Sequence, residues 1–129
     1  MREIKFRVWN TFLKKYQTLQ ETARKGDIMP SDNELKVTTN YELILEQYTG
    51  LKDKNGTKIY EGDIISHEKY GTLSIWYDNG GYVASDGNDE DGSCFDLELL
   101  DEYHNDILHD CLVIGNVHEE GLKWKQRKR

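Results

Sequence analysis

Apolar and polar residues alternate at the start of the chain, where charged residues separate Ile4, Phe6 and Val8. This period-two pattern predicts a half-buried β-strand. The next residues fit two structures. Apolar residues recur at helical spacing from Trp9 to Leu19, which favours a helix capped by Asn10 or Thr11. A turn over residues 10–13 followed by a second strand fits the same residues.

Turn-forming residues separate the later apolar runs. Residues 21–34 contain Gly26 and Pro30 and are expected to form a loop. Residues 35–39 resemble a strand, and residues 41–48 are apolar but too short to assign by period.

Two Asn-Gly pairs, Asn55-Gly56 and Asn79-Gly80, each lie between strand-like runs. Asn-Gly favours a tight hairpin because both central residues of such a turn need positive φ. Further strands are expected at 64–65 and 112–114, with a short helix between residues 99 and 111. Short strands with turns about every ten residues predict a mainly β fold, either a strongly bent antiparallel sheet or a small barrel.

Composition fits one domain of 129 residues with a real core, since 36% of the chain is hydrophobic and 32% is charged. No stretch approaches the roughly 18 apolar residues of a membrane span, and no signal peptide follows Met1. Cys94 and Cys111 imply no disulfide framework. We therefore expect a cytoplasmic protein without membrane contact.

The net charge of −7 is unevenly distributed. Residues 1–25 carry seven Lys or Arg, residues 86–110 carry ten Asp or Glu without a basic residue, and residues 123–129 add five positive charges. This polarity favours a basic partner or contact between copies of the chain. A solvated acidic surface explains the same pattern.

Three motifs are distinctive along the chain. The first is the opening run Met1-Arg2-Glu3-Ile4-Lys5-Phe6-Arg7-Val8-Trp9. The central motif runs Gln47-Tyr48-Thr49-Gly50-Leu51-Lys52-Asp53-Lys54-Asn55-Gly56, then Ile59-Tyr60-Glu61-Gly62-Asp63-Ile64. The last is Val113-Ile114-Gly115-Asn116-Val117-His118-Glu119. Together these motifs resemble the YopX family of phage and prophage proteins. The chain departs from the family where Glu120-Gly121 leads into a basic tail instead of a Pro-containing segment.

The resemblance implies an SH3-like barrel with an additional variable β segment, a phage or prophage origin in a bacterial host, and self-assembly. It implies no particular activity. It also implies a hairpin after Trp9, which we favour over the helix. We expect a single domain: residues 1–47 form the N-terminal strand and variable segment, 48–119 the barrel-like part, and 120–129 a flexible basic tail.

Tyr60-Glu61-Gly62-Asp63 is the best candidate for a chemical site because two nearby carboxylates can share acid and base roles. The structural alternative is favoured: Gly62 provides a bend, Tyr60 packs, and Asp63 accepts hydrogen bonds from turn amides. The same structural role is expected for the other motif residues, Tyr48, Gly50, Leu51, Asn55, Gly56, Gly115 and Asn116.

Metal chemistry has weak support. The acidic loop 86–92 lacks the Gly and Glu that an EF-hand needs at its sixth and twelfth positions. His104 and His109 do not share a helical face, and the two cysteines are too far apart for a zinc knuckle. Asp27 with Glu34-Leu35-Lys36 fits a metal-dependent nuclease loosely. We predict no catalytic, cofactor-binding or metal-binding residues.

Our interpretation is a non-enzymatic accessory protein that binds a host or phage protein through Trp76, Tyr77 and Tyr82, because aromatic residues dominate interface energies. Strand edges or the oppositely charged ends would pair copies into a homo-oligomer. The alternative is a nucleic-acid-associated protein. It would use N-terminal basic and aromatic residues, among them Arg2, Lys5, Arg7, Lys14, Lys15, Phe6, Trp9, Phe12 and Tyr16, together with the basic tail.

Overall fold

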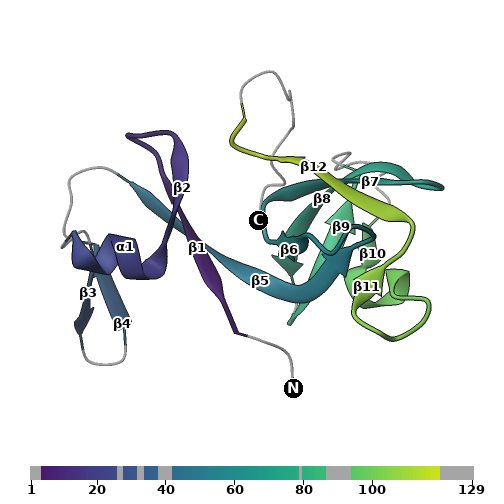
Figure 1. The fold of residues 1–129 in the computed structure, drawn as a ribbon, viewed down its shortest axis with the longest axis horizontal. Coiled ribbons are helices and arrows are strands. Elements are labelled where there is room, and N and C mark those ends of the chain that lie inside the picture. Colours follow the sequence, from purple (N-terminus) through teal and green to yellow (C-terminus); the bar gives the residue numbers. More distant parts are fainter. Residues whose placement is uncertain are drawn as a thin grey trace. The chain divides into compact units, whose positions relative to one another are not determined.

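The computed structural model describes residues 4–25, 28–31, 34–37, 42–78, 80–86 and 94–119. The chain divides into two compact units, Ile4–Gln47 and Tyr48–Arg129, the second together with residues 1–3. Strand β5 (Leu43–Asp53) runs from the first unit into the second. Figure 1 shows the elements along the chain.

In the first unit, β1 (Phe6–Asn10) pairs antiparallel with both β2 (Lys15–Thr18) and the first half of β5. The β1–β2 hairpin confirms the turn and excludes a helix over residues 10–18. Asn10 explains why the chain forms a turn here and not a helix: its buried Oδ1 accepts hydrogen bonds from the amides of Phe12 and Leu13 at 3.0 and 2.9 Å. A short polar side chain that bonds the backbone ahead of it favours a turn.

The loop predicted for residues 21–34 is wrong over two parts, because α1 spans Leu19–Arg24 and a strand covers Ile28–Ser31. Thr18 caps this helix by accepting a hydrogen bond from the Glu21 amide at 3.0 Å. Strands β3 (Ile28–Ser31) and β4 (Glu34–Val37) follow as an antiparallel pair. The strand expected at residues 35–39 is therefore present over 35–37, and residues 38–39 lie outside the described residues.

In the second unit, the later half of β5 pairs antiparallel with β6 (Lys58–Tyr60) and parallel with β11 (Ile107–Leu108). The hairpin predicted at the first Asn-Gly pair is confirmed between β5 and β6, with Gly56 at φ 83°. Asn55 does not have positive φ, so the turn is not the type that needs positive φ at both central residues. Gly50, at φ 89°, lies where the β5–β6 register is irregular. Thr49 closes this irregularity by donating its hydroxyl to the Ile59 carbonyl at 2.7 Å.

A five-stranded antiparallel sheet forms the rest of this unit in the order β10-β9-β8-β7-β12. Its strands are β7 (Asp63–His67), β8 (Gly71–Asp78), β9 (Gly81–Ser85), β10 (Cys94–Asp96) and β12 (Cys111–Asn116). Gly80, at φ 85°, lies in the β8–β9 turn where the second Asn-Gly pair was predicted. Asn79 itself is outside the described residues.

The core of this unit is built from side chains of every strand around it. Its buried members are Leu51, Ile59, Ile65, Leu73, Ile75, Ala84, Leu97, Leu108 and Cys111. Tyr82 and Phe95 pack against this cluster. Burying such aliphatic side chains contributes about 1.5–3 kcal/mol each, which makes this cluster the main source of stability.

The helix predicted between residues 99 and 111 is wrong. A 3₁₀-helix, η1, covers Leu97–Leu100, and an irregular loop then leads to β11 and β12. The closing strand at 112–114 is confirmed, but Ile114 is 48% exposed and the strand is less buried than predicted. The fold is mainly β as expected, although the described strands form open sheets and no closed barrel among them.

Candidate functional site

The Tyr60–Asp63 motif forms a tight turn between β6 and β7. Gly62 has φ 82°, and the buried Asp63 accepts a hydrogen bond from the Tyr60 amide at 2.8 Å. The backbone of Gly62 extends the turn in two directions: its N–H donates to the Ile75 carbonyl, and its carbonyl accepts from the Val117 amide, both at 2.8 Å. The motif therefore joins β8 to the segment that follows β12.

Asp53 plays a similar role at the β5–β6 turn. Its carboxylate is 2% exposed and accepts three backbone hydrogen bonds, from Asn55, Thr57 and Val113, each at 2.9 Å. The bond to Val113 spans sixty residues of sequence and ties the turn to β12. Sequence reasoning could place Asp53 in the motif, but no local signal revealed this distant partner.

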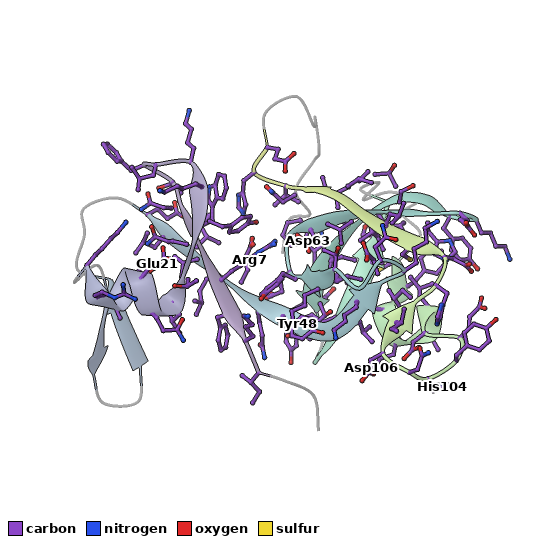
Figure 2. The ribbon with its side chains drawn as sticks, viewed as in Figure 1. Arg7, Glu21, Tyr48, Asp63, His104 and Asp106 are labelled. Carbon is purple, nitrogen blue, oxygen red and sulfur yellow. The ribbon has the colours of Figure 1, made fainter. Side chains whose placement is uncertain are left out.

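The other motif residues lie against these turns. Tyr48 pairs with Tyr60 across β5 and β6, with ring centroids 5.5 Å apart. Asn116 is the register partner of Asp63 and accepts a hydrogen bond from the His118 amide at 2.9 Å. Figure 2 labels Tyr48 and Asp63 in this unit. The central and final sequence motifs are thus adjacent in the fold, through backbone-directed contacts.

The three aromatic residues proposed to bind a partner divide between the two faces of the β8–β9 hairpin. Tyr77 and Tyr82 are cross-strand partners with ring centroids 5.2 Å apart, and Tyr77 is 43% exposed. Trp76 pairs with Val83, so its side chain points to the opposite face. Its Nε1 donates to the Ser74 hydroxyl at 2.7 Å.

The negative charge of Glu61, in the motif turn, acts on one residue of this aromatic pair, Tyr82. Burial raises the pKa of Tyr82, and the negative charge of Glu61 and the neighbouring Tyr77 raise it further. Tyr82 therefore stays protonated well into the alkaline range and keeps a hydroxyl that can donate a hydrogen bond.

A groove of about 460 Å³ lies beside the hairpin and is lined by Asp78, Gly80, Gly81, Tyr82, Val83, Cys94, Asp96, Glu98 and Leu99. We call it the acidic groove, because three of these residues carry carboxylates and none carries a positive charge. Leu99 leaves 75% of its surface exposed at the rim. Asp78, Asp96, Glu98 and Leu99 were not among the predicted site residues. The only signal was the acidic excess over residues 86–110.

The two cysteines differ sharply. Neither forms a disulfide, Cys94 is exposed at the groove, and Cys111 is 1% exposed in the core. Burial raises the pKa of the Cys111 thiol to about 12, and the carboxylates of Asp110, Asp53 and Glu68 act in the same direction. A thiol that keeps its proton is a poor nucleophile, so the reactive sulfur of the native protein is Cys94.

The loop before β11 contains His104 and Asp106, both labelled in Figure 2 and both with positive φ, 53° and 64°. Asp101 holds the loop: its buried carboxylate accepts hydrogen bonds from the amides of Asn105 and Asp106 at 3.2 and 3.0 Å. His109 instead contacts the Asn105 amide group. Among the described residues, no group of three or more His, Cys, Asp or Glu is placed to hold a metal ion.

The basic N-terminal residues are partly neutralised within their own unit. Arg7 forms an ion pair with the Glu46 carboxylate at 3.0 Å, stacks 3.9 Å above the Tyr16 ring, and shares Glu46 with the Tyr16 hydroxyl. Several residues singled out in the sequence lie outside the described residues: Arg2, Asp27, the basic tail, and residues 87–93, which include most of the acidic loop. The side chain of Glu34 is not described either.

Comparison with known proteins gives a family and a fold. None of the helices in the described ranges has the length and apolarity that crossing a bilayer requires. No curated protein matches the chain. The crystal structure of protein EF1440 from Enterococcus faecalis is similar with a TM-score of 0.55 and 26% identity, over 92% of this chain and 96% of that one. The family model described as YopX protein matches residues 5–122. The chain therefore belongs to the YopX family.

Proposed function

We propose that this chain is a non-enzymatic phage or prophage accessory protein that binds a host or phage protein in the bacterial cytoplasm. The observation that carries the proposal is the acidic groove, whose lining includes Asp78, Asp96 and Glu98 together with the exposed Leu99. Membership of the YopX family supports the phage or prophage source.

The chemistry of the groove defines the partner. Its carboxylates favour Lys or Arg, because complementary charges steer association and exclude acidic competitors. Leu99 and Tyr82 favour a large apolar side chain, whose burial contributes most of the affinity. The volume of about 460 Å³ suits one or two side chains rather than a folded domain. The partner is therefore a protein segment with basic residues flanking an aromatic or large aliphatic one.

The aromatic pair extends this surface. Tyr82 lines the groove and also contacts Tyr77, which is half exposed. We assign partner binding to Tyr77 and Tyr82. Trp76 points to the other face from this pair, the face that it shares with Val83 and Asp96 of the groove, and its indole is bonded to Ser74.

Two further proposals accompany the first. The Tyr48–Glu119 part is proposed to be a variant of the SH3-like barrel, and strand edges are proposed to mediate a homo-oligomer. Nucleic-acid binding is less favoured, because the ion pair between Arg7 and Glu46 reduces the positive charge available to phosphate.

The test is an affinity capture from lysate of a phage-carrying host, with nuclease added. The bait is compared with a groove variant, Asp96→Asn/Glu98→Gln/Leu99→Ser, and with a matched variant in the exposed loop, Glu102→Gln/Tyr103→Ser. We expect a protein that is retained by the bait and the matched variant and lost from the groove variant. If all three baits retain the protein, the groove is not the binding site. If nuclease treatment alone removes the captured protein, the nucleic-acid alternative is favoured.

A further inference from the structure

The basic tail of this chain has the chemistry that the acidic groove selects. Lys123 and Lys125 flank Trp124, and Arg127, Lys128 and Arg129 follow. A large aromatic side chain between two lysines matches an exposed leucine surrounded by three carboxylates, both in apolar area and in charge.

Strand order brings residues 116–119, the last described residues before the tail, to the same end of the sheet as the groove. β12 ends beside the start of β7, where Asn116 pairs with Asp63. The start of β7 lies beside the later part of β8, because β7 and β8 are antiparallel. Gly81, which begins β9, is paired with Asp78 at the end of β8, and both residues line the groove. The hydrogen bond from Val117 to Gly62 fixes where the chain leaves this end.

The distance is within reach of the tail. From β12 to β9 is three strand spacings, or about 14 Å at ~4.8 Å per spacing. Residues 116–119 form a turn closed by hydrogen bonds between Asn116 and both His118 and Glu119. From Glu119 to Trp124 the chain can extend up to ~17 Å at ~3.3 Å per residue. The tail can therefore cross two strands and still place Trp124 in the groove.

We infer that the acidic groove binds the basic tail of its own chain, with Trp124 against Leu99 and its flanking lysines facing Asp78, Asp96 and Glu98. The tail then competes with the partner for the groove. This inference rests on the proposed function in taking the groove as a binding surface. A tether this short favours the tail of the same chain over that of a second copy, because it keeps the effective concentration in the millimolar range.

Cys94 provides the test, since it is exposed at the groove while Cys111 is buried and serves as an internal reference for folding. Its alkylation by iodoacetamide is followed by intact mass in the full chain and in a chain ending at Gly121. With an effective tail concentration on the order of 1 mM and a Kd on the order of 0.1 mM, the tail should slow the reaction about tenfold. Truncation also removes the positive charge of the tail, which by itself disfavours the Cys94 thiolate and would slow alkylation. A faster reaction of the truncated chain therefore shows that the tail had covered Cys94.

Three full-length variants refine the test. Trp124→Ala and Lys123→Gln/Lys125→Gln should both accelerate alkylation of Cys94. Lys15→Gln/Lys25→Gln, which makes the same charge change at exposed residues of the other unit, should leave the rate unchanged. Salt at about 1 M should reproduce the effect of truncation, because the Debye length falls to ~3 Å.

Equal rates for the full and truncated chains would overturn the inference. A protection that disappears on dilution would also overturn it, in favour of the tail of a second copy. The proposed function is tested separately with the truncated chain and a synthetic peptide of residues 122–129. If the peptide fails to protect Cys94 even at millimolar concentration, the groove itself is not a binding surface. If it protects while the tethered tail does not, only the further inference fails.

Discussion

Cys111 shows how one buried side chain can make stability depend on pH. Its thiol lies in the core cluster with Leu51 and Leu108, and the carboxylate of Asp53 contributes to its raised pKa. The folded protein therefore binds this proton more tightly than the unfolded chain does. Linkage then requires that the unfolded state lose its proton first as the pH rises.

We expect the free energy of unfolding to decrease between the ordinary thiol pKa of 9.0 and the folded value of about 12. Below pH 9 both states hold the proton and the full stability is present. Above it the unfolded state binds fewer protons, so stability falls by at most ~1.4 kcal/mol per pH unit. Urea titrations at several pH values, with wild type and Cys111→Ala compared at each, measure the effect.

The difference between the two proteins isolates Cys111, because Tyr82 also has a raised pKa and contributes a slope of the same sign to both. A wild-type slope identical to that of Cys111→Ala between pH 8.5 and about 10.5 would contradict the assignment.

At the scale of elements, side chains that accept backbone hydrogen bonds determine how the strands are connected. Asp53 joins the β5–β6 turn to β12, Asp63 closes the β6–β7 turn, and Asp101 holds the loop before β11. These three carboxylates are at most 3% exposed. Their role is to satisfy amides that the sheets leave unpaired.

Replacing Asp53 by Ala should lower the free energy of unfolding by about 2–4 kcal/mol, because three part-buried backbone hydrogen bonds to its buried carboxylate would be lost together. The measurement is the urea midpoint at constant m-value. Glu102→Ala removes an exposed carboxylate and should change stability by less than about 0.5 kcal/mol. Equal effects of the two substitutions would exclude the role assigned to Asp53.

Local turn chemistry explains which elements were predictable. Both Asn-Gly pairs predicted hairpins that the structure contains, because the positive φ of Gly56 and Gly80 is favoured by the residue type itself. Helix α1 was missed because Gly26 and Pro30 dominated the loop prediction, although Thr18 three residues before Glu21 is a capping signal. The helix predicted after Leu99 failed because Asp101 provides the following amides with a non-helical acceptor.

The candidate site was less predictable than the fold. Tyr77 and Tyr82 were proposed from residue type alone, and the register places them together. Asp78 and Leu99 come from elements separated in sequence, so only the pairing of β9 with β10 and the position of η1 bring them to one groove. Such long-range proximity is not encoded in any short window.

At the scale of the whole molecule, charge distribution constrains the partner. The chain carries a net charge of −7, and its acidic excess lies in residues 86–110, where the groove receives Asp96 and Glu98. Positive charge lies mainly near the two ends of the sequence. The acidic residues at and around the groove would therefore repel a polyanion such as nucleic acid.

We expect nucleic acid to bind no more tightly than a Kd on the order of 10⁻⁴ M at physiological salt, the weak end of non-specific binding. Fluorescence anisotropy with labelled single-stranded and duplex DNA measures it. The chain ending at Gly121 serves as the control that separates any contribution of the basic tail. A micromolar Kd that weakens steeply with salt in both forms would restore the nucleic-acid alternative.

The buried polar chain in the first unit has a consequence for how this sequence can change. Asn10 donates to Gln17 at 3.4 Å, Gln17 donates to Thr22 at 2.7 Å, and Thr22 donates to the Thr18 carbonyl at 2.8 Å. Each side chain is a hydrogen-bond partner of the next. Replacing one therefore leaves the polar atoms of another buried without a hydrogen bond. Positions 10, 17 and 22 should therefore vary in concert among relatives, as one evolutionary unit rather than as three independent residues.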